Sequence, residues 1–167
     1  MMAPRVVIVG PPGAGKTTVG TLVAQRLRTT FRDTDADIER TAGKPITDIF
    51  VEDGEPAFRA LERAAVVAAL DEHDGVLALG GGAVVAPENR ARLAGHLVVF
   101  LDVGLADAVA RVGLNRDRPL LIESPRAQLK RLLDERRPVY LEAATVTVDT
   151  GGRTPEDIAD EVAKHVR

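Results

Sequence analysis

The sequence predicts an α/β domain, a three-layer sandwich in which helices cover both faces of a five-stranded parallel sheet. Short β-branched segments alternate along the chain with longer helix-compatible segments, which is the pattern of a parallel sheet. The expected strands are apolar nearly throughout, as suits burial on both faces. With 167 residues, 45% hydrophobic and 28% charged, the chain has the size and composition of one folded domain, and we expect a single domain over residues 1–167.

The expected elements follow one another in a regular order. Strands are expected at residues 5–9, 31–33, 76–79, 97–101 and 145–148. Helices are expected at 16–28, 87–93, 105–112 and 154–166, the last with Thr154 as N-cap and Pro155 at its first position. Two segments rich in glycine, proline and polar residues, 41–58 and 113–125, break the alternation, and we expect them to be mobile flaps above the sheet.

Composition narrows the classes of function. A formal net charge of -3 gives no overall reason to bind nucleic acid. The chain has no cysteine, which excludes disulfides and thiolate metal sites and suits a reducing compartment. The longest apolar run, 64–70, is far shorter than the ~20 residues that span a bilayer. The three histidines are scattered without metal-ligand spacing, and we expect them at the surface of a cytoplasmic protein that binds neither nucleic acid nor membrane.

Residues 10–17, Gly-Pro-Pro-Gly-Ala-Gly-Lys-Thr, follow the first strand and open the first helix, as a phosphate-binding loop does. The two prolines carry no amide proton, so amides further along the loop are expected to hold phosphate oxygens at a helix N-terminus, whose dipole favours anions. Lys16 would reach the β- and γ-phosphates, and Thr17 would place its hydroxyl on a magnesium ion. The predicted nucleotide-binding residues here are Gly13, Ala14, Gly15, Lys16, Thr17 and Thr18.

A phosphate-binding loop leaves the reaction open. Kinases, GTPases, ATP-driven motors and regulatory switches all use one. The chain contains no Asn-Lys-x-Asp sequence, so a guanine-selective switch of the familiar kind lacks its base-reading residues. The residues that bind a phosphate acceptor must therefore be sought elsewhere in the chain.

Two carboxylates and a glycine triplet stand at strand ends, where open α/β sheets bind their ligands. Asp33 and Asp35 are two apart, so in an extended segment both would face the phosphate loop, although the pair could simply cap the next helix. Residues 80–82 are three consecutive glycines directly after a strand, which suggests close approach of backbone to a ligand; a tight turn is the alternative.

Several arginines are further candidates for binding anions. Arg59 and Glu62 share one helix face, where an ordinary surface ion pair would look the same. Arg118, with its neighbour Arg116, lies in the second flap and could close over a triphosphate, or belong to a solvated basic loop. Near the end of a later helix, one arginine of the pair at 136 and 137 could hold a carboxylate bidentately.

Asp102 ends an apolar strand and imitates a magnesium-binding aspartate. Asp33 already offers a carboxylate near the first strand, and Asp102 leads directly toward another helix. We therefore interpret Asp102 as a strand-end cap.

These motifs occur together in the order, and at approximately the spacings, of shikimate kinases, and the chain resembles that family from about residue 5 to 160. The resemblance is carried by the phosphate loop, Asp33-Thr34-Asp35, Phe58-Arg59-x-x-Glu62, Gly80-Gly81-Gly82, Arg118-Pro119-Leu120-Leu121 and Arg136-x-Pro138-x-Tyr140. It implies a P-loop kinase fold of the nucleoside monophosphate kinase type, with a substrate-binding insertion at about 34–60 and a lid at about 113–125.

The resemblance also implies a bacterial ATP-dependent enzyme. It would transfer the γ-phosphoryl group of MgATP to the 3-hydroxyl of shikimate, a step toward chorismate and the aromatic amino acids. We expect a monomer with ATP and shikimate as its small-molecule substrates and Mg²⁺ as its metal ion.

Roles for individual residues follow from the same resemblance. Asp35 would grip the reacting hydroxyls and accept the proton, with Lys16 and Arg118 completing the catalytic set. The implied shikimate-binding residues are Asp35, Arg59, Gly81, Gly82 and Arg136, with Glu62 orienting Arg59. Asp33 would reach magnesium through water. The implied contacts on the nucleotide side are Arg111, Arg118, Arg153 and Pro155.

One position departs from the family pattern, and two alternatives remain. Leu79, preceded by Ala78, stands where many relatives carry threonine, so contact with magnesium rests on Thr17 and Asp33. A kinase for gluconate or another small metabolite would share the phosphate loop, but it should not need both the glycine triplet and Arg136. A nucleotide-dependent regulatory module that has lost catalysis is the other alternative.

Overall fold

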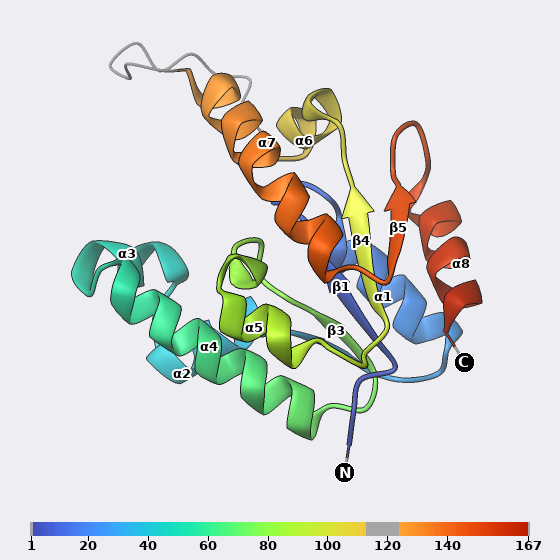
Figure 1. Ribbon diagram of the computed structural model, residues 1–167, viewed down its shortest axis with the longest axis horizontal. Helices are drawn as coiled ribbons and strands as arrows, with labels where there is room; N and C mark the ends of the chain where they lie inside the picture. Colours follow the sequence, from blue (N-terminus) through green and yellow to red (C-terminus); the bar gives the residue numbers. More distant parts are fainter. Residues whose placement is uncertain (1, 113–123, 167) are drawn as a thin grey trace.

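A five-stranded parallel sheet forms the centre of the molecule (Figure 1), as predicted. The computed structural model describes residues 2–112 and 124–166. The strands are β1 (Val6–Val9), β2 (Phe31–Asp33), β3 (Val76–Ala78), β4 (Val98–Asp102) and β5 (Val146–Asp149). They are ordered β2-β3-β1-β4-β5, and every adjacent pair is parallel. Because the chain leaves central β1 and returns on both sides of it, the crevice for a ligand is expected at the carboxyl end of β1.

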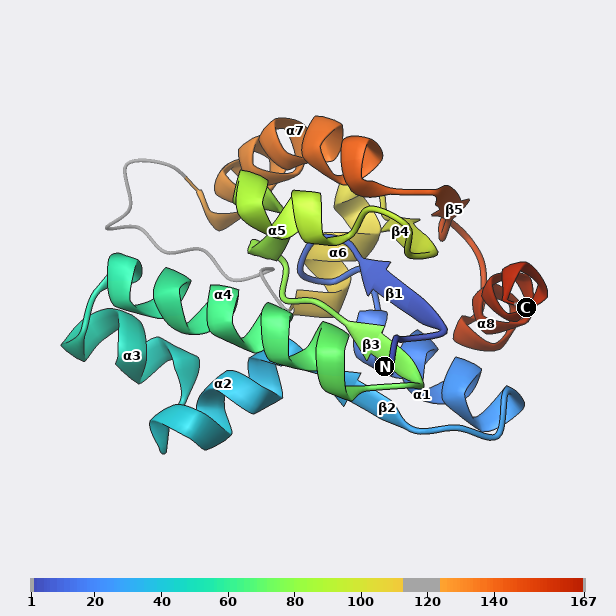
Figure 2. The ribbon, with the colours of Figure 1, turned by 60° about the horizontal axis from the view of Figure 1, so that its bottom comes forward.

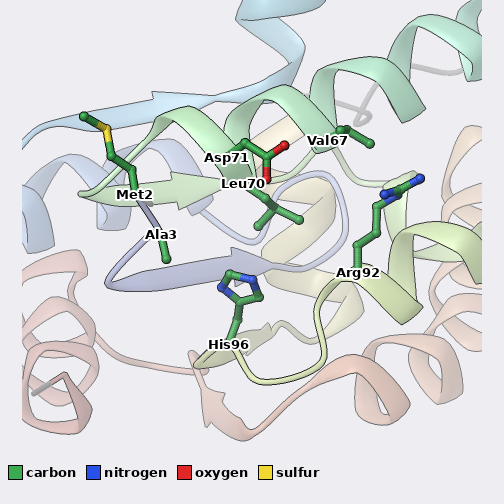
Figure 3. Close-up of a pocket in the computed structure, with 7 residues that line it drawn as sticks. All are labelled: Met2, Ala3, Val67, Leu70, Asp71, Arg92 and His96. Atoms are coloured by element: carbon green, nitrogen blue, oxygen red, sulfur yellow. The ribbon is translucent and has the colours of Figure 1, made fainter.

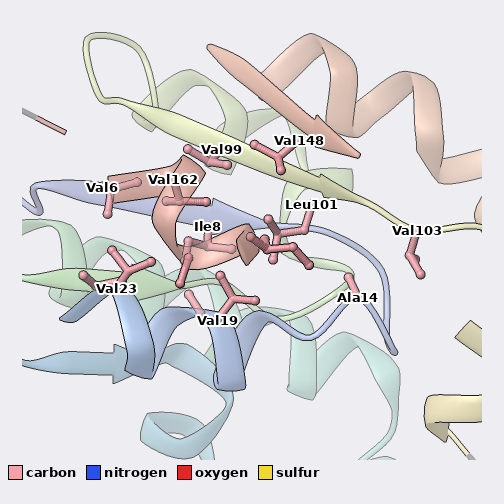
Figure 4. Close-up of a cluster of buried hydrophobic side chains, with 14 of the residues drawn as sticks. Val6, Ile8, Ala14, Val19, Val23, Val99, Leu101, Val103, Val148 and Val162 are labelled. Carbon is pink, nitrogen blue, oxygen red and sulfur yellow. The ribbon is translucent and has the colours of Figure 1, made fainter. Parts of the chain in front are cut away.

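Helices cover both faces of this sheet (Figure 2). Alternate residues of β1 point to opposite faces, and Val6 and Ile8 pack with α1 (Lys16–Arg26) and α8 (Pro155–His165), as Figure 4 shows. Val7 and Val9 pack on the other face with residues of α4 (Glu55–Glu72) and α7 (Pro125–Ala143). The strands are therefore buried on both sides, which explains why their sequences are apolar rather than alternating.

The segment 41–58 is mostly helical, so the expectation of a flap without regular structure there is wrong. It contains the end of α2 (Thr34–Ala42), all of α3 (Ile46–Glu52) and the start of α4. Its glycines and prolines lie at helix boundaries: Gly43 caps the end of α2, Pro45 precedes α3, and Gly54 precedes α4. Buried Ile38, Ile49 and Phe58 give these three helices a small core of their own.

Three helical segments remain. They are the short 3-10 helix η1 (Ala83–Val85), α5 (Pro87–Arg92) and α6 (Leu105–Val112). Most of the second expected flap, 113–123, lies outside the described residues, and with it Arg118 and Arg116. In the part of the chain that is described, no helix is both long and apolar enough to cross a bilayer.

Two local expectations are corrected. Helix α7 does not end near Arg136 but continues through Pro138 to Ala143. His73 is buried rather than at the surface, because its Nε2 lies 3.2 Å from the carbonyl oxygen of Thr30 and 3.0 Å from that of Val76. Those two carbonyl groups are hydrogen-bonding partners for Nε2 inside the protein. The histidine thereby connects the segments that lead into β2 and β3 at the amino edge of the sheet.

Candidate active site

The phosphate-binding loop surrounds the N-terminus of α1. Gly15, the N-cap of α1, has φ 87°, a left-handed conformation that glycine adopts without strain. The Nζ of Lys16 donates to the carbonyl oxygens of Gly10, at 2.7 Å, and Pro11, at 3.1 Å. Burial lowers the pKa of Lys16 to about 8, although the nearby carboxylates of Asp35 and Asp33 oppose this effect. The Lys16 ammonium group is therefore buried near the loop, close to the carboxylates of Asp33 and Asp35.

Asp33 and Asp35 both reach this loop, by a different geometry from the one expected. Only Asp33 belongs to the strand, and Asp35 lies in the first turn of α2. One carboxylate oxygen of Asp33 accepts a hydrogen bond from the Asp35 amide at 2.9 Å, which caps α2, and the other accepts one from the Thr17 hydroxyl at 3.3 Å. Capping and proximity to the phosphate loop therefore coexist. Burial, followed by the charge of Asp33, raises the pKa of Asp35 to about 6.

Each residue of the glycine triplet approaches a different part of the site. A Cβ on Gly80 would overlap the Asp35 carboxylate, and one on Gly82 would lie 2.6 Å from the Arg59 guanidinium. A Cβ on Gly81 would lie 3.0 Å from Pro12 in the phosphate loop. A side chain at Gly80 or Gly82 would displace a candidate functional group, and one at Gly81 would press on the phosphate loop, so close packing favours glycine at all three positions.

Arg59 and Glu62 form a partly buried ion pair rather than an ordinary surface pair. The guanidinium donates to Glu62 at 2.8 Å, and the Glu62 side chain is only 2% exposed. Burial raises the pKa of Glu62, and the charge of Arg59 opposes that rise. Arg59 also lies 5.2 Å above the ring of Phe58, which packs on the half-exposed ring of Phe50. The arginine is thereby held over an apolar wall.

The structure distinguishes the two neighbouring arginines of α7. Arg136 is half-buried and lies near Lys16 and Glu62, whose pKa values its charge lowers. Arg137 is exposed and pairs with Asp102 at 2.7 Å. Asp102 therefore forms an ion pair with Arg137, a partner that the interpretation as a strand-end cap did not include. The motif spacing selected Arg136, and that residue is the one beside the phosphate loop.

The residues expected on the nucleotide side are only partly brought together. Arg111 donates to the carbonyl oxygen of Gly13 at 3.0 Å and so lies against the phosphate loop. Arg153 instead pairs at 2.6 Å with Glu161 of α8, the helix that begins at Pro155, and also donates to the carbonyl oxygen of Asp157 in its first turn. Arg118 lies outside the described residues.

A cavity of about 460 Å³ connects the phosphate loop to the acidic pair. Its lining residues are Gly13, Gly15, Lys16, Thr17, Thr18, Asp33, Asp35, Leu79 and Arg111. A second hollow lies at the opposite, amino edge of the sheet and is shown in Figure 3; it contains none of these residues and no part of the phosphate loop. The cavity at the carboxyl ends of the strands is therefore the candidate active site.

The donors present fit a nucleotide with a hard metal ion. Thr17 and Asp33 bring a hydroxyl and a carboxylate oxygen within 3.3 Å of each other, and Mg²⁺ prefers oxygen ligands of these kinds. Leu79 lines the same cavity with an apolar side chain, so no hydroxyl comes from the end of β3. Within the ranges 2–112 and 124–166, no group of three or more His, Cys, Asp or Glu side chains could hold a metal by themselves.

Two residues near the site had no role assigned from the sequence. Thr34 is fully buried, and its hydroxyl accepts a hydrogen bond from the Gly80 amide at 3.0 Å, which connects the start of α2 to the triplet. Tyr140 reaches the triplet from α7, with its hydroxyl donating to the carbonyl oxygen of Gly81 at 2.5 Å. Both residues lie within the sequence motifs that carry the family resemblance, and no other feature of the sequence pointed to them. Their hydrogen-bond partners, Gly80 and Gly81, are distant in the chain.

The chain resembles known proteins along nearly its whole length. Residues 12–167 match the family described as shikimate kinase. A shikimate kinase from Salinispora arenicola is 63% identical over 162 residues, covering 97% of each chain. A shikimate kinase from Thermobifida fusca is 58% identical, covering 98% of this chain and 95% of that relative. The solved structure of a shikimate kinase from Acinetobacter baumannii in complex with shikimate has a TM-score of 0.87 and 36% identity, covering 98% of this chain and 92% of that one.

Proposed function

Because the chain belongs to the shikimate kinase family, we propose that it transfers the γ-phosphoryl group of MgATP to the 3-hydroxyl of shikimate. The reaction needs a site for phosphates, a site for an anionic polyhydroxylated ring, and a proton acceptor between them. The described residues supply all three at one edge of the sheet. The identity to curated shikimate kinases, above 50% over nearly the full chain, supports the same substrate.

The acceptor site consists of cations and backbone around Asp35. Arg59 and Arg136 offer two guanidinium groups for the carboxylate of shikimate, and such groups bind carboxylates bidentately. Gly81 and Gly82 offer backbone amides, and the ion pair with Glu62 orients Arg59. Phe50 and Phe58 supply an apolar wall.

Asp35 is positioned to hold the reacting hydroxyl and to accept its proton. Its raised pKa, about 6, is still below neutral pH, so the group stays mostly ionised there, and the rise makes it a better proton acceptor than an exposed aspartate. Phosphoryl transfer passes through a loose transition state, so orienting the hydroxyl matters more than base strength.

Lys16 and the amides of residues 13–18 hold the phosphates in this proposal. On binding nucleotide, the Lys16 ammonium exchanges its two carbonyl partners in the loop for phosphate oxygens. Thr17 directly, and Asp33 through water, would hold Mg²⁺, which neutralises charge on the phosphates when bound. Arg118, in the lid, would add a further cation over the phosphates, and Arg111, Arg153 and Pro155 would lie on the adenine side.

One observation carries the proposal: the glycine triplet touches Asp35 through Gly80 and Arg59 through Gly82, while its middle residue packs on the phosphate loop. An acceptor seated on the triplet is therefore adjacent to a carboxylate, a guanidinium and the triphosphate site at once. This arrangement suits a small acid with several hydroxyl groups.

The test is an ADP-release assay that offers shikimate, gluconate and a nucleoside monophosphate in parallel. We expect shikimate alone to stimulate ADP release, with phosphorus NMR placing the new phosphate on the 3-hydroxyl. Equal stimulation by gluconate would identify a different small-metabolite kinase. Slow ATP turnover that no acceptor stimulates would favour a regulatory module. A cytoplasmic monomer remains our expectation, which light scattering and cell fractionation can check.

A further inference from the structure

Tyr140 is the only tyrosine of the chain, and the proposed chemistry does not use it. It lies on α7, one helical turn after Arg136 and therefore on the same face of that helix. The side chain is 1% exposed, and its ring stacks on Phe100 of β4 with the centroids 5.0 Å apart. Packing therefore fixes the ring, and the hydroxyl projects from a rigid base.

The Tyr140 hydroxyl reaches the glycine triplet beside Arg136. It donates to the carbonyl oxygen of Gly81 at 2.5 Å. The charge of Arg136 lies close enough to oppose the effect of burial on the pKa of Tyr140. Burial raises the pKa of Tyr140, and the hydroxyl stays protonated as this donation requires.

The bond to Gly81 also sets the direction of the next amide. The carbonyl group of Gly81 and the N–H of Gly82 belong to one planar peptide, which is trans, so they point in opposite directions. Glycines on both sides of a peptide leave it free to rotate, because no Cβ limits either residue. Holding the carbonyl toward α7 therefore directs the Gly82 N–H away from α7.

The neighbouring carbonyl groups of this loop are held by residues close in the chain. Gly80 O accepts from the Ala83 amide at 3.0 Å, Gly82 O accepts from Val85 at 3.2 Å, and Ala83 O accepts from the Asn89 side chain at 2.9 Å. The carbonyl of Gly81 is the one that a distant helix holds. Its orientation therefore depends on where α7 lies.

We propose that Tyr140 is a positioning residue for the acceptor: by holding the carbonyl group of Gly81, its hydroxyl keeps the Gly82 N–H in the orientation that the substrate requires. The inference rests on the proposed function, because it concerns how the same site binds shikimate. Tyr140 itself need not touch the substrate.

The first test is Tyr140→Phe, which removes one hydroxyl and keeps the ring on Phe100. We expect the KM for shikimate to rise about 3- to 10-fold, equivalent to about 0.7 to 1.4 kcal/mol, the range of one hydrogen bond. The KM for ATP should stay within about twofold of wild type, because the phosphate loop keeps its own contacts. A normal shikimate KM in a folded Tyr140→Phe enzyme would overturn the proposal.

The matched control is Leu93→Ala, which removes apolar volume from the same buried cluster and keeps both rings of the stack. A purely structural role predicts that both variants lose thermal stability and that neither changes the shikimate KM selectively. The proposal predicts a lower Tm without a change in shikimate KM for Leu93→Ala, and a change in shikimate KM for Tyr140→Phe. Equal selective changes in both would overturn it.

The second test uses the wild-type sequence and does not depend on a variant that folds. Because the chain has one tyrosine, 3-fluorotyrosine labelling gives one protein fluorine resonance, from position 140. We expect shikimate alone to shift this resonance and gluconate to leave it in place. A resonance unmoved by saturating shikimate would overturn the inference while leaving the kinase activity intact. Absence of shikimate phosphorylation by wild-type enzyme would instead refute the proposed function.

Discussion

Replacing Asp35 with asparagine should make the protein more stable and nearly inactive. Burial and the charge of Asp33 raise the pKa of Asp35 from 3.8 to about 6, so the folded state disfavours the ionised carboxylate. At 1.36 kcal/mol per pH unit, holding that charge costs roughly 3 kcal/mol above pH 6. Asparagine removes the charge, and the attraction of Lys16 is already contained in this cost because it opposes the rise in the pKa of Asp35. We therefore expect a gain of about 3 kcal/mol, or about 6 to 12 °C in Tm for a chain of this size.

The pH dependence identifies the cause of that gain. Well below pH 3.8, Asp35 is protonated in both the folded and the unfolded chain, and the two proteins should be equally stable; at pH 4.0 the difference should still be small. Between pH 4 and 6 the unfolded chain releases the proton first, so wild-type stability falls relative to Asp35→Asn as pH rises. Above pH 6 the difference stays constant.

Thermal unfolding of both proteins without ligands at pH 4.0, 5.0, 6.0 and 7.5 measures this difference. Asp74→Asn is the control for the loss of one carboxylate, because Asp74 is exposed. The activity assay should show kcat lower by about 100-fold or more, since asparagine accepts no proton. A Tm advantage that is absent at pH 7.5, or equally large at pH 4.0, would refute the reasoning.

Three further predictions concern other parts of the site. Gly82→Ala should displace Arg59, whose guanidinium lies 2.6 Å from the new Cβ position, and raise the shikimate KM about tenfold; unchanged steady-state kinetics would contradict this. Arg136→Lys loses bidentate binding and should raise the shikimate KM about 10- to 100-fold, whereas Arg137→Lys should not, and equal effects would reverse the assignment. In the enzyme without nucleotide the pKa of Lys16 is about 8, so its ammonium group loses its proton at higher pH. Calorimetric titration with ADP should therefore show an affinity that falls between pH 8 and 9.5. A constant Kd would show that this charge does not contribute to ADP binding.

The sequence was sufficient to predict the sheet, and it selected the candidate site residues, whose roles remain predictions. Apolar strands and a phosphate loop have local signatures, because strand burial and tight turns limit which residues can occupy each position. The error at 41–58 arose because glycine and proline mark helix ends as well as loops. The error at His73 arose because its carbonyl partners, Thr30 and Val76, come from separate strand ends.

Chain order by itself determined what chemistry is available here: a phosphate loop, two aspartates, three glycines and several arginines at strand and helix ends. Only the tertiary structure decided that Arg137 of α7 pairs with Asp102, what a side chain on the glycine triplet would meet, and that Tyr140 reaches Gly81. The physical reason is that these contacts connect residues 23 to 69 positions apart in the chain. Their distances depend on how the layers pack around β1, which no local pattern in the chain encodes.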